Sequence, residues 1–125
     1  MQLGSLLSCA AMESCIFCRI AAGTAPAKIV FADDDVVAFH DLAPRAPTHV
    51  LVIPRRHIVS LAHATPEEGD IVGKLMLAAA EVARRTGIAD GGYRVVTNCG
   101  AEAGQSVPHI HIHVLGGRRF GWPPG

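Results

Sequence analysis

The sequence predicts an α+β fold: a five-stranded antiparallel sheet with one long and one short helix. Three observations support this fold class. Five short stretches have the apolar and β-branched composition of strands, one longer stretch has the periodicity of an amphipathic helix, and most links between them are short. With 125 residues, 50% of them hydrophobic and 18% charged, the chain suits a single compact domain.

The N-terminal part divides into a leader and the start of the domain. We expect residues 1–12 to be a flexible leader, because their apolar patch lacks the basic start and the full apolar core of a signal peptide. The domain is expected at residues 13–125. Its first element is a short helix or turn in the stretch SCIFCRIAAG, residues 14–23, which puts its larger apolar side chains on one side.

The strands are expected along the rest of the chain. An Asp-rich turn at residues 33–35 separates the first two, and a loop with two prolines at residues 43–49 precedes the third. The last strand is expected to hold a group of histidines. The expected strands occupy residues 27–34, 36–42, 49–54, 92–100 and 106–117.

The long helix is expected between the third and fourth strands. Thr65 is a suitable N-cap, Pro66 suits the first helical position, and Glu68 completes a capping box. Gly87 is expected to end the helix. The stripe expected to face the core consists of Ile71, Val72, Leu75, Met76, Ala79, Val82 and Ala83.

The charge and cysteine content exclude several classes of protein. The net charge is zero and the arginine pairs are short, so the chain lacks the basic stripe of a nucleic-acid-binding surface. No apolar run approaches the ~20 residues needed to cross a bilayer. The four cysteines, without a signal peptide, do not indicate a disulfide framework. We therefore expect a cytoplasmic protein with no nucleic-acid or membrane partner.

The stretch SVPHIHIHVLGG holds His109, His111 and His113 at a spacing of two. Because side chains alternate between the two faces of a strand, the three imidazoles are expected on one face, with neighbouring Cβ atoms ~7 Å apart. Histidine is neither a favoured core residue nor a strong strand former, so the row indicates a functional site. The side chains expected on the opposite, core-facing side are those of Ile110, Ile112 and Val114.

Two kinds of chemistry fit a row of imidazoles. A His-x-His pair can bind zinc, and catalytic zinc sites often use three protein nitrogens. Alternatively, a neutral imidazole can attack an electrophile while its neighbours fix its tautomer and handle protons. The preceding loop favours the second, because Gly104, Gln105 and Ser106 offer backbone, amide and hydroxyl donors suited to phosphate oxygens. Phosphoryl or nucleotidyl transfer through a phospho-histidine is therefore expected.

The pattern His-φ-His-φ-His-φ-φ at residues 109–115, where φ is apolar, resembles the signature of the histidine triad superfamily. The segments IFCRI, PAKIVFADD, AFHDLAPRAPTHVLVIPRRHI and AGQSVPHIHIHVLGGRRFGWPPG are similar to its histidine triad nucleotide-binding (HINT) branch. The resemblance covers residues 15–125. Pro108 and Gly121 depart from the branch, where an aromatic residue and a histidine are usual, so the preferred amine stays open.

This resemblance implies a homodimer in which the two five-stranded sheets join. It also implies hydrolysis of purine nucleoside 5′-phosphoramidates to a nucleoside monophosphate and an amine. His111 would be the nucleophile that carries the nucleotidyl group, and His113 would bind a phosphate oxygen. His109 and His49 would belong to the supporting hydrogen-bond network, and Ser106 would lie near the leaving amine.

The resemblance further implies a purine nucleotide site. Asp41 would accept both ribose hydroxyls, although an aspartate also suits a plain turn before the proline loop. Trp122 would reach toward the neighbouring subunit's site. The implied base pocket consists of Ile16, Phe17, Ile20, Phe39, His40 and Leu42, of which the first three also suit a plain core. The implied ribose and phosphate contacts are Asn98, Gly104, Gln105, Ser106 and Val107.

Catalysis is expected to need no cofactor, but the resemblance leaves a structural zinc open. Cys15-x-x-Cys18 alone is a weak metal signal, since small apolar packing also explains it. Some bacterial relatives with this spacing hold zinc through the two cysteines, a histidine at the position of His57, and the first triad histidine, here His109. Two cysteines and two histidines make a suitable closed set for zinc.

Other functions stay open at this point. A related branch splits dinucleoside polyphosphates and also has a glutamine four residues before the first triad histidine, as Gln105 is here. A second alternative is a nucleotide sensor or protein-binding dimer without a catalytic role. A hydrolase with zinc on the triad itself is less favoured, because no carboxylate lies near the triad in sequence to act as its base.

Overall fold

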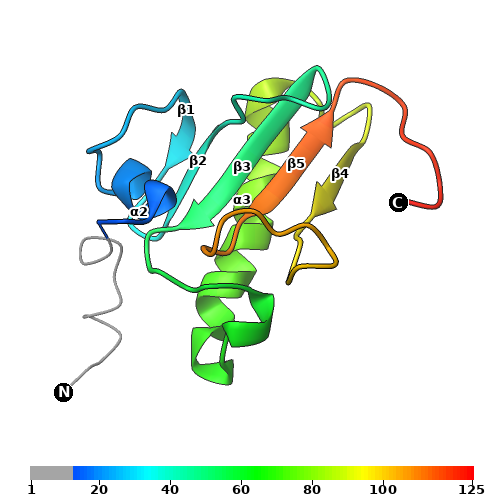
Figure 1. The fold of residues 1–125 in the computed structure, drawn as a ribbon. Coiled ribbons are helices and arrows are strands. Elements are labelled where there is room, and N and C mark those ends of the chain that lie inside the picture. Colours follow the sequence, from blue (N-terminus) through cyan, green and yellow to red (C-terminus); the bar gives the residue numbers. More distant parts are fainter. Residues whose placement is uncertain (1–12) are drawn as a thin grey trace.

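The computed structural model describes residues 13–125, and the leader expected at residues 1–12 lies outside the described residues. One sheet of five antiparallel strands, in the order β1-β2-β3-β5-β4, forms the centre of the molecule (Figure 1). The predicted α+β fold is therefore confirmed. The strands are β1 (Ile29–Ala32), β2 (Val36–His40), β3 (Thr48–Pro54), β4 (Tyr93–Val96) and β5 (Ile112–Gly116). The helices are α2 (Ile16–Ala21), α3 (Gly69–Thr86) and two short 3₁₀ turns, Leu61–His63 and Pro66–Glu68.

The two helices cover opposite faces of the sheet, with α3 behind it and α2 in front of it in Figure 1. Strand β3 shows the consequence, because it is apolar on both sides. Val50 and Val52 pack in the cluster under α3, whereas Leu51 and Ile53 pack in the cluster under α2. A strand that is covered on both faces needs a continuous apolar run rather than an alternating one. The run HVLVIP therefore fixes β3 at the centre of a three-layer arrangement.

Helix α3 begins and ends as its sequence predicts, with one refinement at its start. The Thr65 backbone N–H donates to the Glu68 carboxylate at 2.8 Å, and this half of the capping box holds a 3₁₀ turn at Pro66–Glu68 before the α-helix begins. Gly87 ends the helix in the left-handed region, at a φ of 79°. No helix among residues 13–125 is long and apolar enough to cross a membrane.

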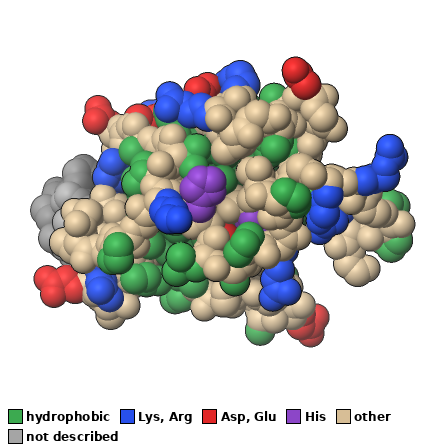
Figure 2. Space-filling view, turned by 90° about the horizontal axis from the view of Figure 1, so that it is seen from above, with side chains coloured by type: hydrophobic (Ala, Val, Ile, Leu, Met, Phe, Trp, Pro, Cys, Tyr) green, Lys and Arg blue, Asp and Glu red, His purple; other side chains and the backbone are tan. Residues whose placement is uncertain are grey.

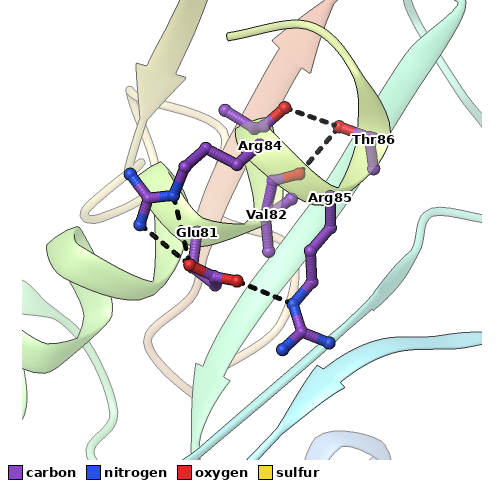
Figure 3. Close-up of polar contacts among 6 residues, drawn as sticks. Glu81, Val82, Arg84, Arg85 and Thr86 are labelled. Carbon is purple, nitrogen blue, oxygen red and sulfur yellow. Dashed lines mark hydrogen bonds and ion pairs between the residues drawn. The ribbon is translucent and has the colours of Figure 1, made fainter.

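The last turn of α3 is held by charged side chains (Figure 3). The Glu81 carboxylate accepts hydrogen bonds from Arg84 and Arg85, both at 2.8 Å, and the Thr86 hydroxyl donates to the Val82 carbonyl at 2.8 Å. The two arginines also complement the negative end of the helix dipole. This cluster is exposed on the α3 side, away from the histidine row, and we assign it to helix stability alone.

The predicted core stripe of α3 is wrong at Met76. Its side chain is 50% exposed, whereas Ala78, outside the predicted stripe, is buried. At about 100° per residue, Met76 lies just beyond one end of the buried arc of the helix. That arc consists of Leu75, Ala78, Ala79, Val82 and Ala83. Leu75 is fully buried at the centre of the contact, and this turns Met76 away from the sheet.

The predicted strand at residues 106–117 is also too long, because β5 begins only at Ile112. Pro108 has no N–H to give to a neighbouring strand, and the His109 N–H donates to the Val107 carbonyl at 2.8 Å, which closes a turn. The alternation of faces nevertheless holds beyond this turn. As predicted, the core cluster under α3 contains Ile110, Ile112 and Val114.

Candidate functional site

A cavity of about 240 Å³ lies on the α2 side of the sheet. Apolar side chains from α2, β2 and β3 make most of its wall, and polar groups gather where the histidine row passes. This is the usual composition of a site for a small ligand with one polar end. The lining residues are Ile16, Phe17, Ile20, Pro26, Ala27, Phe39, His40, Asp41, Leu42, Leu51, Ser106, Val107, His111 and His113. From above, the molecule shows a histidine side chain at the centre of the surface, with hydrophobic side chains beside it (Figure 2).

The structure brings most of the predicted site residues to this cavity. The predicted residues that do not line it are His49, Asn98, Gly104, Gln105, His109 and Trp122. The lining residues that the sequence prediction missed are Pro26, Ala27 and Leu51. Leu51 pairs with Phe39 on one side and His113 on the other, so the strand register places it on the cavity floor. Register is a property of the sheet, and no single-strand pattern signals it.

His111 is the central imidazole, and its hydrogen bond defines its tautomer. Its Nδ1 lies 2.8 Å from the His109 carbonyl oxygen, which can only accept, so Nδ1 carries the proton. In the neutral ring the lone pair is then on Nε2. The Phe17 ring packs edge-on against the imidazole at 5.1 Å between centroids, and the side chain is buried. His111 therefore has one orientation fixed by two contacts, with an unprotonated nitrogen at the cavity.

His49 and His113 form a second hydrogen-bonded arrangement. The Arg45 backbone N–H donates to His49 Nδ1 at 3.0 Å, so the proton of His49 is on Nε2. That Nε2–H lies 2.8 Å from His113 Nδ1 and donates to it. His113 must then carry its own proton on Nε2. The Arg45 N–H therefore sets the tautomer of His49, and His49 in turn sets the tautomer of His113. Because His113 lines the cavity, its Nε2–H is a donor there.

Both histidines are neutral at physiological pH. Burial lowers the pKa of His113 to about 4, with smaller contributions from the nearby imidazoles of His111 and His49. Burial also lowers the pKa of His49, against the opposing effect of the Asp41 carboxylate, which lies 3.4 Å from its Nε2. A neutral His113 keeps the tautomer just described and donates through Nε2.

The sequence allows two roles for Asp41, a turn residue and a ribose ligand, and its position is compatible with both. Its Oδ1 accepts the Ala43 N–H at 2.8 Å, which is the turn expected before the proline loop. Its Oδ2 lies on the side of His49, and the residue lines the cavity at the end of β2. The turn therefore orients the carboxylate toward the cavity.

Three further side chains, those of Cys15, Cys18 and His57, form a cluster with the first triad histidine. His109 Nε2 donates to the Pro54 carbonyl at 2.9 Å, so its Nδ1 lone pair faces the sulfur atoms of Cys15 and Cys18, at 3.4 and 3.5 Å. His57 Nδ1 lies 3.2 Å from the Cys18 sulfur, and the four ligand atoms all lie within 4.8 Å of one another. A tetrahedral zinc with bonds of about 2.3 Å to sulfur and 2.05 Å to nitrogen separates such atoms by about 3.6 Å. The donor set and spacing fit zinc.

The C-terminal tail lies near the β4 edge of the sheet (Figure 1), opposite the edge formed by β1. In Figure 1 it runs past the β5 and β4 side of the molecule, whereas α2 lies on the β1 and β2 side. Arg94 on β4 donates to the Gly121 carbonyl at 2.8 Å and holds the tail there. Trp122 is 82% exposed and does not line the cavity of its own chain.

Comparison with known proteins identifies the class to which this fold and histidine row belong. Residues 22–120 match the histidine triad (HIT) domain family. An uncharacterised HIT-like protein from Synechocystis is 50% identical over 113 residues, which cover 90% of this chain and 98% of the relative. A HIT family hydrolase from Legionella pneumophila has a crystal structure that is similar at a TM-score of 0.86, with 42% identity over 89% of this chain and 99% of that one.

A more distant relative is the histidine triad nucleotide-binding protein from Candida albicans, at a TM-score of 0.74 and 29% identity, covering 87% of this chain and 82% of that chain. This chain therefore belongs to the HIT family, and the resemblance inferred from its histidine row is confirmed.

Proposed function

We propose that the protein is a nucleotide-binding hydrolase that cleaves purine nucleoside 5′-phosphoramidates. In the first step the His111 Nε2 lone pair attacks the α-phosphorus, and the P–N bond breaks as the nitrogen takes up a proton and leaves as an amine. In the second step water attacks the nucleotidyl-histidine, loses a proton, and releases the nucleoside monophosphate. Nucleophilic catalysis of this kind replaces one difficult displacement with two easier ones.

One observation carries this proposal: the 2.8 Å bond from His111 Nδ1 to the His109 carbonyl. In the neutral ring the bond keeps the proton on Nδ1 and the lone pair on Nε2, where a nucleophile needs it. It also stabilises the positive charge that develops on the imidazole when Nε2 bonds to phosphorus, because the carbonyl dipole faces the N–H that shares the charge. The same contact therefore prepares the ground state and stabilises the intermediate.

We assign the phosphate oxygens to His113 and the leaving nitrogen to Ser106. His113 presents an Nε2–H that the relay from His49 fixes, and a donor held in place in a site with little water stabilises developing charge effectively. Ser106 lines the same cavity and offers a hydroxyl. Asp41 would hold the ribose, since a carboxylate can accept two hydroxyl hydrogen bonds.

The charge of the cavity favours a substrate with one phosphate. Among the described residues that line it there is no lysine and no arginine. A polyphosphate bridge between two nucleosides carries several negative charges, which proteins usually bind with basic side chains or a metal. We therefore favour the phosphoramidate over the dinucleoside polyphosphate.

A hydrolytic zinc held by His49 and His113 fits the distances poorly. Two nitrogens bound to one zinc at about 2.05 Å lie about 3.3 Å apart in a tetrahedron. The His49 and His113 nitrogens are 2.8 Å apart, which is a hydrogen-bond distance. This pair shares a proton in our proposal and does not share a metal.

A second cavity gives room for the amine that leaves. Its volume is about 290 Å³, and it shares Ile16, Ser106 and Val107 with the first. Pro108, which replaces the usual aromatic residue of the branch, lines this second cavity. We propose that the compact proline widens the space beyond Ser106 and so affects which amines are accepted.

We also propose a structural zinc bound by Cys15, Cys18, His57 and His109. The zinc would tie α2, which forms one wall of the cavity, to the histidine row. Its four ligands leave His111 and His113 free for phosphate chemistry. Reduced cysteines that serve as metal ligands suit the cytoplasm, where thiols are kept reduced.

We further propose that the protein is a homodimer formed through β4 and α3. Strand β4 is a sheet edge, and an exposed edge pairs readily with a second copy. The half-exposed Met76 adds apolar area on α3. The position of Trp122 supports this assembly, since its side chain is exposed and does not line the cavity of its own chain.

A charge placed in this interface tests the dimer. Met76→Glu is expected to lower the sedimentation mass from that of two chains to that of one at micromolar concentration. Leu77→Glu, on the neighbouring exposed position, is the matched control and should leave the mass unchanged. A wild-type protein that sediments as one chain would contradict the dimer.

A substrate comparison tests the catalytic proposal. Adenosine 5′-phosphoramidate and diadenosine tetraphosphate are offered separately to the wild-type protein, and acid quenching traps any nucleotidyl-protein for mass spectrometry. The phosphoramidate should be consumed with a trapped adenylyl group on His111. Faster cleavage of the tetraphosphate would favour the alternative hydrolase, and nucleotide binding without cleavage of either compound would favour a sensor.

A further inference from the structure

Gln105 has no amide hydrogen left for a phosphate. Its Nε2 donates to the Val59 carbonyl at 2.7 Å and to the Val107 carbonyl at 3.0 Å. Its Oε1 accepts the Gly100 N–H at 3.0 Å. A primary amide has two hydrogens, and both are used on main-chain oxygens. The expectation that this residue contacts phosphate is therefore replaced by a different role.

Two partners of the amide belong to its own connection between β4 and β5, and the third comes from the segment after β3. Val59 lies after β3, whereas Gly100 lies five residues before Gln105 and Val107 two residues after it. The main chain of Gln105 reinforces the junction, because its N–H donates to the Gly100 carbonyl at 3.1 Å. Residues 100–105 thus form a loop that Gln105 closes twice, once with its backbone and once with its side chain.

The same junction flanks Ser106 on both sides. On one side is the closed loop, and on the other the Val107 carbonyl accepts both the Gln105 amide and the His109 N–H. Pro108, between them, has a φ restricted by its ring. Ser106 is exposed at the rim of both cavities, so its position depends on these neighbours rather than on packing of its own side chain.

We propose that Gln105 is a positioning residue that holds the Ser106 hydroxyl against the leaving nitrogen, an inference that rests on the proposed function. Only an amide supplies two donors and one acceptor at this point. A glutamate would place carboxylate oxygens against the Val59 and Val107 carbonyls, which repel it, while an alanine would leave all three main-chain groups without this partner. Gln105 acts through Ser106 and does not touch the substrate.

Leaving-group dependence separates this role from general destabilisation. The two substrates are adenosine 5′-phosphoramidate bearing an alkylamine, which must be protonated to leave, and adenosine 5′-(4-nitrophenyl) phosphate, whose phenolate leaves without a proton. Gln105→Ala should lower kcat on the amine compound on the order of 10²-fold, the usual cost of displacing a catalytic group by about 1 Å. The loss on the nitrophenyl ester should be less than about threefold, with a similar bound on the change in affinity for adenosine monophosphate.

Amide hydrogen exchange provides a readout that needs no turnover. In Gln105→Ala and Gln105→Glu, the Gly100 N–H loses its acceptor or its geometry and should exchange at least tenfold faster than in the wild type. Glu102→Gln, on an exposed side chain of the same loop, is the control and should change neither exchange nor the ratio of the two rates.

The outcomes distinguish the two proposals. An unchanged Gly100 exchange rate in both variants, or equal losses on the two substrates, would overturn the role of Gln105 while leaving the phosphoramidase proposal intact. A wild-type protein that turns over neither compound would overturn the proposed function and this role together.

Discussion

His109 and His113 lie on the same side of one short segment, yet their rings face different chemistry. His109 is completely buried against two sulfur atoms and His57, whereas His113 faces His49 and Asp41 at the wall of a cavity. Burial lowers the pKa of each to about 4. The same residue type, with the same pKa, therefore lies at a sulfur end beside two thiols and at a cavity end beside a second imidazole and a carboxylate. What differs is the set of partners that distant segments supply.

His111 stands between the two ends, and its replacement should have the largest effect. His111→Asn removes the nucleophile but keeps a polar side chain of smaller size. We expect kcat on the phosphoramidate to fall by on the order of 10⁴-fold or more, as losses of covalent nucleophiles do. Affinity for adenosine monophosphate, measured by calorimetry, should stay within a few-fold. Substantial remaining turnover would contradict the row as the centre of catalysis.

Cys15→Ser tests the sulfur end, where His109 lies, without changing the other end of the row. We expect the purified wild-type protein to contain about one equivalent of zinc and the variant less than a tenth, as measured by mass spectrometry of the metal. A ligand present at 1,000 times its dissociation constant stabilises by about 4 kcal/mol. The variant should therefore melt on the order of 10 °C lower.

Cys99→Ser is the matched control, since Cys99 lies outside the cluster. It should keep both the metal content and the melting temperature. The structural zinc would be contradicted if wild-type protein, purified without chelators, held less than a tenth of an equivalent of zinc.

His49→Ala tests the cavity end of the row, where His113 lies. Without the Nε2–H of His49, the tautomer of His113 is no longer fixed, and its donor is not held toward the phosphate. We expect kcat to fall on the order of 10²-fold, the usual contribution of one positioned donor, with zinc content unchanged. His63→Ala removes a histidine outside the cavity and serves as the control. Equal kcat in the two variants would show that the relay is not used.

The smallest expected effect is the contribution of His113, at the cavity end, to the pH dependence of the free energy of unfolding. Because the folded-state pKa of His113 lies at about 4, below the value of about 6.5 expected when unfolded, the folded state binds fewer protons between these values. The stabilising contribution of neutral His113 is thus present above pH 6.5 and is lost as the pH falls toward 4.

The comparison with His113→Gln isolates this contribution. Between pH 6.5 and 4, the ratio of the wild-type and variant unfolding constants should change by up to about tenfold per pH unit, since a single proton is involved. Urea unfolding at fixed pH steps provides both constants. Parallel curves for the two proteins would mean that His113 is not desolvated in solution.

The fold was largely predictable because its signals are local. The capping box at Thr65 and the glycine that ends α3 act within one helical turn. The spacing of the histidine row fixed which side chains share a face, and Ile110 and Ile112 lie in the core as the alternation requires. The errors arose at the edges of the elements: Met76 lies just beyond the buried arc of α3, and β5 starts late because Pro108 cannot pair.

The site was predictable by residue type and less so by partner. A sequence shows Cys15 and Cys18 at a metal-like spacing, but only the folded chain brings His57 and His109 to within bonding reach of one metal. It shows Gln105 beside the triad, but only the folded chain brings the Val59 carbonyl to its amide, next to the local Gly100 and Val107 groups.

By itself the sequence determined the class of fold, the row of imidazoles and the apolar face behind it, because backbone geometry alone converts a spacing of two into a common face. The tertiary structure decided the tautomers of His111 and His113 and the separate environments at the two ends of the row. These depend on carbonyls, amides and sulfurs from segments far apart in the chain, and hydrogen-bond partners at 3 Å exist only after the chain has folded.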